Sequence, residues 1–264
     1  MHETLSALVE RALAGRQRPL EFYLRDQSRL PGSRANLDLA DDMQSLLAKA
    51  AVQNPERVRS LLYYLINSDR QKVASNTPEE FIMLCGIIAF GACAAAVPAW
   101  REETYALLSQ HACSAYWRVR EGVALGYQYL LYACTQETLE HFMQLVTTGS
   151  YLHQRAAIVA IAEPSILYLP EMLPAALTLQ RIALERLQAV APVERKNEQF
   201  RILRRTLGYT LSVITAAGPE QGFALMRECA TWNDPDIREV LRENLKKKRL
   251  AKYAKDAEEV SRLL

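Results

Sequence analysis

The chain has 264 residues, half of them hydrophobic and 23% charged, so it can bury a sizeable core and is not expected to be disordered. Its 32 Lys and Arg residues against 30 Asp and Glu leave a net charge of +2. This balance excludes a whole-molecule attraction to nucleic acid or to an anionic membrane, so any such attraction must come from a local patch.

Helix-start signals recur along the chain. Thr77-Pro78-Glu79-Glu80 is a capping box with proline at the first helical position. Asn54-Pro55 and Asp234-Pro235 repeat a polar cap followed by proline, and Gly218-Pro219 marks the end of one helix and the start of the next. Apolar residues between these signals follow a helical period, and no segment shows sustained alternation. The pattern therefore predicts an all-α chain.

The expected helices follow one another through short turns. Their ranges are 2–14, 18–29, 37–52, 55–68, 78–96, 99–113, 117–133, 135–148, 151–168, 171–190, 196–217, 219–231 and 235–250, with a short last helix to 264. The turn over 30–36, with Gly32 at the bend and Asn36 as N-cap, closes an N-terminal helical cap over residues 1–36. This turn has either a structural role or, through Arg34, a role in binding.

The segment 81–100 carries no charge and is long enough to cross a bilayer. Gly86, Gly91 and several alanines dilute its hydrophobicity, and Pro98 would break it. Helices that are apolar all round also occur in the cores of large helical proteins. We therefore expect a buried central helix and no membrane partner.

Two features repeat at intervals of about one helical hairpin. The first is an arginine early in a helix, found at Arg120, Arg155, Arg204 and Arg238. The second is a run of small and aliphatic residues, at 86–91 and 122–126, that would let neighbouring hairpins approach closely. With the Val119-Arg120 pair and the alternating aliphatic and alanine positions that follow it, residues 54–250 resemble the HEAT-repeat family, most strongly over 114–133 and 233–250.

The resemblance implies a right-handed α-α superhelix, a HEAT-like solenoid of about five helical hairpins behind the N-terminal cap. The solenoid would cover residues 37–264 as one continuous structural domain, with second helices lining a concave surface. Stacking is also expected on physical grounds, because a single hairpin cannot bury its apolar stripe. The ends of such a stack need atypical capping units.

The leading functional hypothesis is a non-enzymatic scaffold that binds a protein partner on its concave surface. The residues expected there are Arg118, Arg120, Tyr127, Gln154, Arg204 and Arg238. A row of guanidinium groups suits carboxylate or phosphate recognition. The alternative is that each arginine pairs with an acidic residue of the neighbouring repeat and is structural.

A second hypothesis is nucleic-acid binding through a basic C-terminal patch. Its candidate phosphate-binding residues are Arg201, Arg205, Arg242, Lys246, Lys247, Lys248 and Arg249. They could follow a phosphate backbone without reading bases. The alternative is a solvated helix end, where positive charge complements the helix dipole.

An enzyme related to the HEAT-like DNA alkylation-repair glycosylases is the third hypothesis, because the chain is similar to them in size and helix content. The residues Trp117–Glu121 do not match the aromatic-plus-Asp motif of these glycosylases. No residue of this chain is therefore assigned a catalytic role. The four histidines lack zinc-site spacing. Asp41 and Asp42 project about 100° apart on a helix and do not converge on one ion. No metal, cofactor or small-molecule substrate is predicted.

The five cysteines are odd in number and lie mostly in apolar runs, which is typical of buried free thiols in a reducing compartment. Residues 1–15 carry charges and have the pattern of an amphipathic helix, which a secretory signal would not tolerate. A cytoplasmic location is therefore expected.

Overall fold

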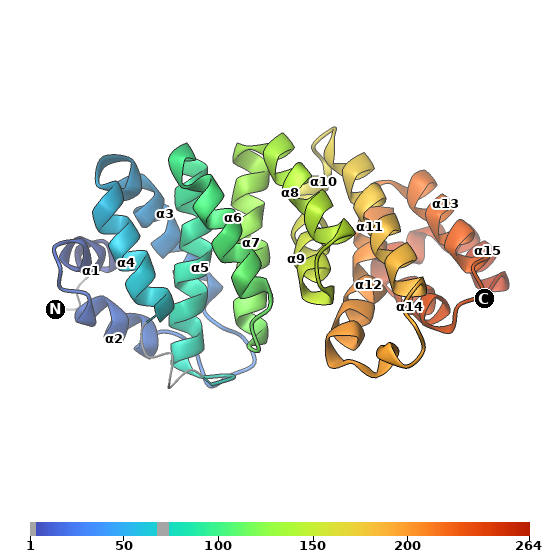
Figure 1. Cartoon of the computed structure of the whole chain (residues 1–264), viewed down its shortest axis with the longest axis horizontal. Coiled ribbons are helices and arrows are strands. Elements are labelled where there is room, and N and C mark those ends of the chain that lie inside the picture. Colours follow the sequence, from blue (N-terminus) through green and yellow to red (C-terminus); the bar gives the residue numbers. More distant parts are fainter. Residues whose placement is uncertain (1–3, 68–73) are drawn as a thin grey trace. The chain divides into compact units, whose positions relative to one another are not determined.

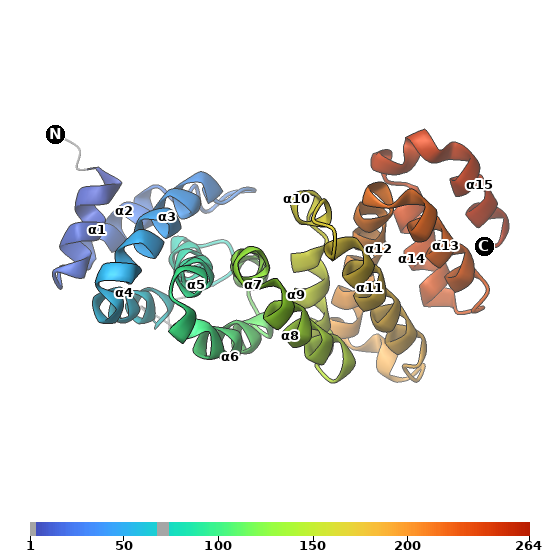
Figure 2. The ribbon, with the colours of Figure 1, turned by 90° about the horizontal axis from the view of Figure 1, so that it is seen from above.

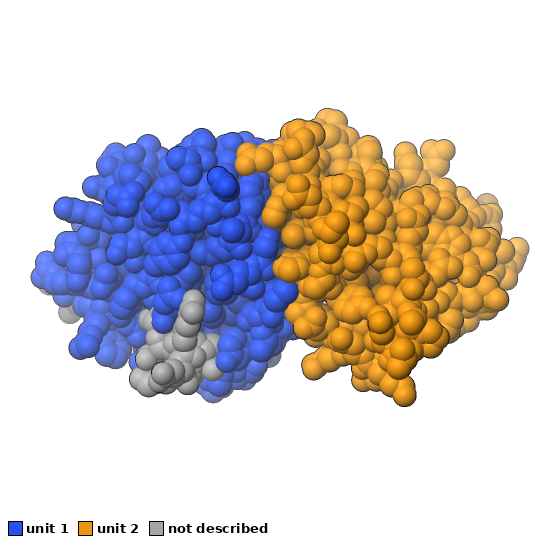
Figure 3. All heavy atoms as spheres, in the orientation of Figure 1, with its two compact units in different colours: residues 1–135 blue, residues 136–264 orange. Residues whose placement is uncertain are grey.

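The structure is a computed structural model that describes residues 4–67 and 74–264. These residues form α-helices and short 3-10 segments, and no strand occurs among them, which confirms the predicted all-α solenoid. Their contacts divide the chain into two compact units, residues 1–135 and 136–264, which we call unit 1 and unit 2 (Figure 3). The predicted N-terminal cap lies within unit 1.

Unit 1 is a row of long helices with shorter helices packed against it. Its elements are α1 (Leu5–Leu13), α2 (Arg18–Asp26), α3 (Leu37–Gln53), α4 (Pro55–Asn67), α5 (Pro78–Ala96), the 3-10 turn η1 (Pro98–Trp100), α6 (Arg101–Ala112) and α7 (Trp117–Ala133). Helices α3, α5 and α7 pack side by side, while α4 and α6 contact this row (Figures 1 and 2). We call α3, α5 and α7 the inner row of unit 1.

Helix α5 is the centre of unit 1 and contacts α2, α3, α4, α6 and α7. Because it has neighbours on every side, it can be apolar all round. Within the described residues it is the one helix long and apolar enough to cross a membrane, and 83% of that apolar stretch is buried inside the protein. The prediction of a buried central helix is confirmed.

Glycines allow α5 and α7 to touch through their backbones. A Cβ atom placed on Gly91 would lie 2.3 Å from the carbonyl oxygen of Gly126, a distance that no side chain tolerates. The small residues at 86–91 and 122–126 therefore do what their pattern predicts and bring two successive second helices into close contact.

Unit 2 repeats the arrangement around a different central helix. Its elements are α8 (Thr135–Thr147), which begins at the boundary, α9 (Tyr151–Ile161), α10 (Pro164–Leu167), α11 (Met172–Gln188), η2 (Glu194–Lys196), α12 (Glu198–Ala217), α13 (Pro219–Ala230), α14 (Pro235–Leu245), η3 (Lys248–Tyr253) and α15 (Ala254–Arg262). Helix α12 packs between α9 and α14, and α11 and α13 lie against this row. We call α9, α12 and α14 the inner row of unit 2.

Two helices end five or more residues earlier than the sequence predicts. The helix expected over 151–168 ends at Ile161, because Glu163 precedes Pro164 and takes an extended conformation with φ −113° and ψ 124°. The chain then restarts as the short α10. The helix expected over 235–250 ends at Leu245 and is followed by the 3-10 helix η3.

Candidate functional site

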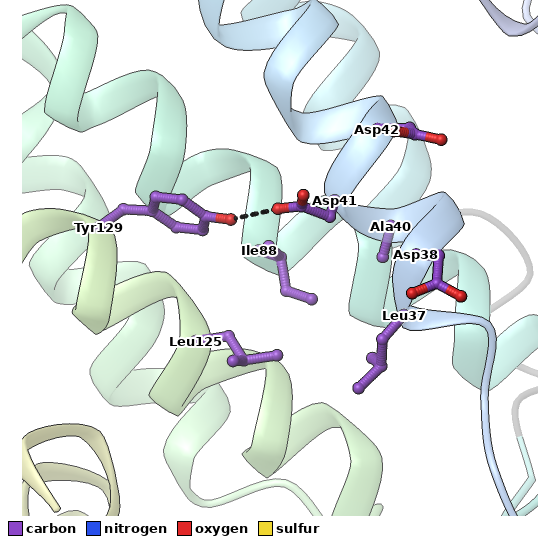
Figure 4. Close-up of a pocket in the computed structure, with 8 residues that line it drawn as sticks. All are labelled: Leu37, Asp38, Ala40, Asp41, Asp42, Ile88, Leu125 and Tyr129. Atoms are coloured by element: carbon purple, nitrogen blue, oxygen red, sulfur yellow. Dashed lines mark hydrogen bonds between the residues drawn. The ribbon is translucent and has the colours of Figure 1, made fainter. Parts of the chain in front are cut away.

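Two hollows lie on the inner row of unit 1 and share part of their lining. The first has a volume of about 490 Å³ and is lined by Leu37, Asp38, Ala40, Asp41, Asp42, Ile88, Leu125 and Tyr129 (Figure 4). The second has a volume of about 460 Å³ and is lined by Arg29, Ser33, Arg34, Ala35, Leu37, Asp38, Leu84, Trp117, Arg118, Glu121 and Leu125. Because Leu37, Asp38 and Leu125 line both, we treat the two hollows as one feature and call it the inner groove.

Apolar side chains form the floor and part of the rim of the inner groove. Leu84 and Ile88 come from α5 and are buried. Leu37 and Trp117, by contrast, are 50% and 47% exposed, although both are large and apolar. Single exposed apolar side chains are ordinary, whereas exposed apolar surface gathered at a hollow is a feature of interaction sites.

One end of the inner groove is acidic. Asp38, Asp41 and Asp42 lie on the first turns of α3, and no Lys or Arg is among the residues that line this first hollow. The Tyr129 hydroxyl donates to Asp41 Oδ1 over 2.9 Å, across the space between α7 and α3 (Figure 4). Burial, together with this hydrogen bond, raises the pKa of Tyr129, so its hydroxyl remains a donor at neutral pH.

The other end combines basic side chains with the exposed indole. The Arg118 guanidinium lies over the Trp117 ring, 4.7 Å from its centroid, which is a cation–π contact. Arg34 is exposed and makes no ion pair within the described residues. Arg29 approaches Asp38 at 3.8 Å, with both side chains largely exposed.

A buried ion pair supports this end of the groove. Arg118 Nη1 and Glu80 Oε2 are 3.2 Å apart, and the two side chains are only 6% and 0% exposed. The Arg118 backbone N–H donates to Glu80 Oε1 over 3.2 Å, and its Nη2 donates to the carbonyl of Gly32 over 2.8 Å. Arg118 therefore ties the turn over 30–36 to α5 and α7.

The capping box predicted at Thr77–Glu80 forms only in part. The Glu80 backbone N–H donates to Thr77 Oγ1 over 3.4 Å, as expected. The Glu80 carboxylate, however, accepts from the backbone N–H of Asn76 over 2.7 Å and from Arg118. Asn76 Oδ1 in turn accepts from the Gly32 N–H over 3.0 Å. The glutamate thus joins a network that holds the groove rather than only capping its own helix.

The structure places the early-helix arginines among protein acceptors. Arg120 Nη1 donates to the carbonyls of Ser114 and Ala115 over 2.6 and 3.1 Å. Arg204 bonds Asp236 and Glu239 at 2.6 and 2.8 Å. Arg238 donates to the backbone oxygen of Leu264 over 3.1 Å. Arg204 thus pairs with acidic residues of the next inner helix, as the structural alternative expects, whereas Arg120 and Arg238 donate to backbone oxygens.

Four of the six predicted contact residues, Arg118, Arg120, Tyr127 and Gln154, are buried. Tyr127 is 0% exposed, and its hydroxyl lies 3.1 Å from Ser109 Oγ. Gln154 is 1% exposed and donates to the carbonyl of Gly149 over 3.4 Å. A partner on the surface cannot reach either side chain, so we leave both out of the proposed surface. Of the six predicted residues, Arg118 lines the inner groove.

The predicted phosphate-binding residues lie in mixed charge surroundings. Lys246 pairs with Glu243 at 2.5 Å, and Arg242 donates to the backbone oxygen of Leu264 over 2.7 Å. Arg205 and Lys247 line a hollow of about 190 Å³ that also contains Glu239 and Glu243. The residues Arg201, Lys248 and Arg249 are exposed and make no ion pair with any described residue.

The sequence did contain a signal for the acidic end that the predictions did not use. Asp38, Asp41 and Asp42 stand at positions i, i+3 and i+4 of one helix, with Lys49 as the first basic residue to follow them. In the described parts of the chain, no group of three or more His, Cys, Asp or Glu residues is arranged to hold a metal ion.

No protein-family model and no curated protein matches the sequence. Solved structures that are similar to most or all of the chain include two proteins made by engineering or design. One is an engineered protein, with 16% identity over 98% of both chains and a TM-score of 0.37. The other is a designed armadillo repeat protein, with 12% identity over 92% of this chain and 99% of that one and a TM-score of 0.38. At these TM-scores the fold assignment rests on the helices and contacts of this chain itself.

Proposed function

We propose that this chain is a non-enzymatic, HEAT-like scaffold that binds a protein partner, and that the inner groove of unit 1 is the binding surface. Stacked helical hairpins form extended surfaces that serve generally in protein binding. The observation that carries the proposal is the pairing of a hollow with two large exposed apolar side chains, Leu37 and Trp117. A partner would remove both from water.

Site-specific photo-crosslinking tests this proposal. The crosslinking amino acid p-benzoylphenylalanine replaces Trp117 in one variant and Tyr168, which is 83% exposed and lies in unit 2, in another. Both variants are expressed and irradiated in the cells to which the chain is native. We expect a discrete crosslinked protein from position 117 that is absent from position 168.

The competing outcomes are distinct. Crosslinks from position 168 alone, or identical crosslinks from both positions, would remove the inner groove as the binding surface. A second control adds Leu37→Asp to the position 117 variant, which should abolish the crosslink because a charge replaces the exposed apolar rim.

Nucleic-acid binding by unit 2 is the second candidate function. The exposed cations Lys248 and Arg249, which make no ion pair with any described residue, favour it. We expect, on this hypothesis, duplex DNA binding that weakens steeply with salt and a smaller salt slope when Lys246, Lys247 and Lys248 are replaced by Ala. Absence of binding at low salt would exclude it.

A further inference from the structure

We infer that the inner groove takes a linear peptide segment whose side chains follow the order basic, apolar, acidic. The basic side chain would lie against the aspartates of α3, the apolar one against Leu37, Leu125 and Trp117, and the acidic one near Arg34. This inference rests on the proposed function and names the chemical class of the partner.

The acidic end is the first step of the argument. Asp38 stands three residues before Asp41 and four before Asp42, so both pairs face each other on α3. Like charges at these spacings destabilise a helix. The helix dipole favours Asp38 in the first turn, but its effect fades beyond that turn and does not compensate for the other two. Arg29 approaches Asp38 at 3.8 Å, but both side chains are largely exposed, so this contact is weak and a cationic guest near Asp41 and Asp42 would relieve the repulsion further.

Asp41 is also positioned to accept such a guest. Tyr129 and Gln44 both donate to its Oδ1 atom, each over 2.9 Å, which holds the carboxylate in place. Its Oδ2 atom accepts no bond from a described residue, so it can receive an ammonium or guanidinium proton. Charge-assisted hydrogen bonds of this kind are about twice as strong as neutral ones.

The apolar middle gives the second step. Leu37 and Leu125 line both hollows, and Trp117 stands beside them at the basic end. An apolar side chain bound there would cover the exposed faces of Leu37 and Trp117, and burial of apolar surface is the main favourable term in association. Tryptophan is also one of the residue types enriched in binding hot spots.

The basic end sets the direction of the segment. Arg34 makes no ion pair within the described residues, whereas Arg118 already pairs with Glu80. Arg34 is therefore the guanidinium with capacity for an acidic side chain of the guest. The second hollow is lined by Arg29, Arg34 and Arg118 but also by Asp38 and Glu121, so its basic character comes from an excess of one cation. A segment of reversed charge order would place its acidic side chain against the aspartates of the first hollow and lose the contact with Arg34. Phosphates of a nucleic acid would likewise be repelled from the aspartates.

The test uses random linear peptides displayed on phage and selected on the full chain. Selected peptides are then bound to three matched variants. These are Trp117→Ala, the double variant Asp38→Asn with Asp41→Asn, and Asp26→Asn, which removes one exposed acid of α2 outside the groove. Asn keeps the shape of Asp and can still accept from Tyr129. Circular dichroism and thermal melts confirm that each variant is folded.

We expect enriched peptides with a Lys or Arg, then an apolar residue, then an Asp or Glu. Synthetic copies should bind the double Asn variant at least about tenfold more weakly, because they lose charge-assisted bonds, while Asp26→Asn leaves their affinity unchanged. Reversing the order of the charges in the peptide should abolish binding.

Two failures are distinguishable. Peptides that depend on Trp117 but have no basic residue, or that tolerate the double Asn variant, would overturn this inference and leave the proposed function standing. A selection that returns no peptide sensitive to Trp117→Ala would overturn both.

Discussion

Acidic side chains occur on the inner rows of both units, but they are paired with arginines to different extents. In unit 2, Arg195 reaches Asp234 and Asp236 at 2.8 Å each, and Arg204 reaches Asp236 at 2.6 Å. In unit 1, Asp41 and Asp42 of α3 line the first hollow, to which no Lys or Arg contributes, whereas Asp38 has Arg29 at 3.8 Å. Charges that join neighbouring helices build the stack, whereas charges left beside a hollow can meet a partner.

The largest effect is expected at the buried pair that supports the groove. Glu80→Ala removes the carboxylate and leaves the Arg118 guanidinium buried without its ion-pair partner. We expect a loss of about 3–5 kcal/mol in the free energy of unfolding, measured by urea denaturation. In unit 2, Glu228→Ala breaks the pair with Arg181, whose side chain is 38% exposed, and should cost less than about 1 kcal/mol. Equal losses would contradict the distinction between buried and exposed pairs.

Backbone contact between inner helices provides the next test. Gly91→Ala places a methyl group against the Gly126 carbonyl and should destabilise unit 1 by about 1–3 kcal/mol or more, because neither backbone can move freely. The counterpart in unit 2 is Gly208→Ala, whose Cβ would meet only the Glu243 side chain, at 3.3 Å. There the gain in helix propensity offsets the contact, so we expect a change within about 1 kcal/mol. Thermal melts of both variants compare the two rows.

Acidification tests unit 2. Burial, together with the charge of His153, lowers the pKa of His141 from 6.5 to about 4. Between these values the unfolded chain binds the proton and the folded chain does not, so stability falls as the pH drops from 6.5 towards 4. His141 should contribute roughly 1–3 kcal/mol to this loss. His141→Gln should flatten the pH dependence of the urea midpoint over this range, and an unchanged slope would contradict the assignment.

The smallest expected effect is a change in the free energy of unfolding that has opposite signs in the two units. Asp42→Asn relieves the repulsion with Asp38 and should stabilise the chain by about 0.2–0.5 kcal/mol. The same chemical change at Asp236 removes partners from Arg195 and Arg204 and should destabilise it. Urea denaturation of the two variants in parallel measures both shifts. A loss of stability from Asp42→Asn would show that this aspartate has a structural role.

Local signals predicted most of the helices but not the groove. The caps at Asn36, Thr77-Pro78 and Asp234-Pro235 begin helices where expected, because the side-chain bonds that stop fraying are local. The break before Pro164 was missed, although the proline restricts the residue before it. The groove brings Leu37 and Trp117 together, although they are 80 positions apart in the sequence. Their proximity depends on which helices pack together, and a local sequence pattern does not contain this information.

The contacts of the arginines could not be predicted from local sequence either. Their repetition was recognised, but whether Arg204 meets a partner or Asp236 depends on a helix 32 positions further along the chain. Exposure is a property of the packed structure, so Tyr127 and Gln154 were assigned to a surface that they do not reach.

The bond between Arg118 and the carbonyl of Gly32 has a consequence for how a guest would bind. Because the turn over 30–36 is fastened to α5 and α7 before any encounter, this side of the groove is preorganised. A guest would lose its own conformational entropy on docking without also having to order that turn. This side of unit 1 would then keep its shape when a guest binds. Differences in affinity between guests would appear mainly in their dissociation rates.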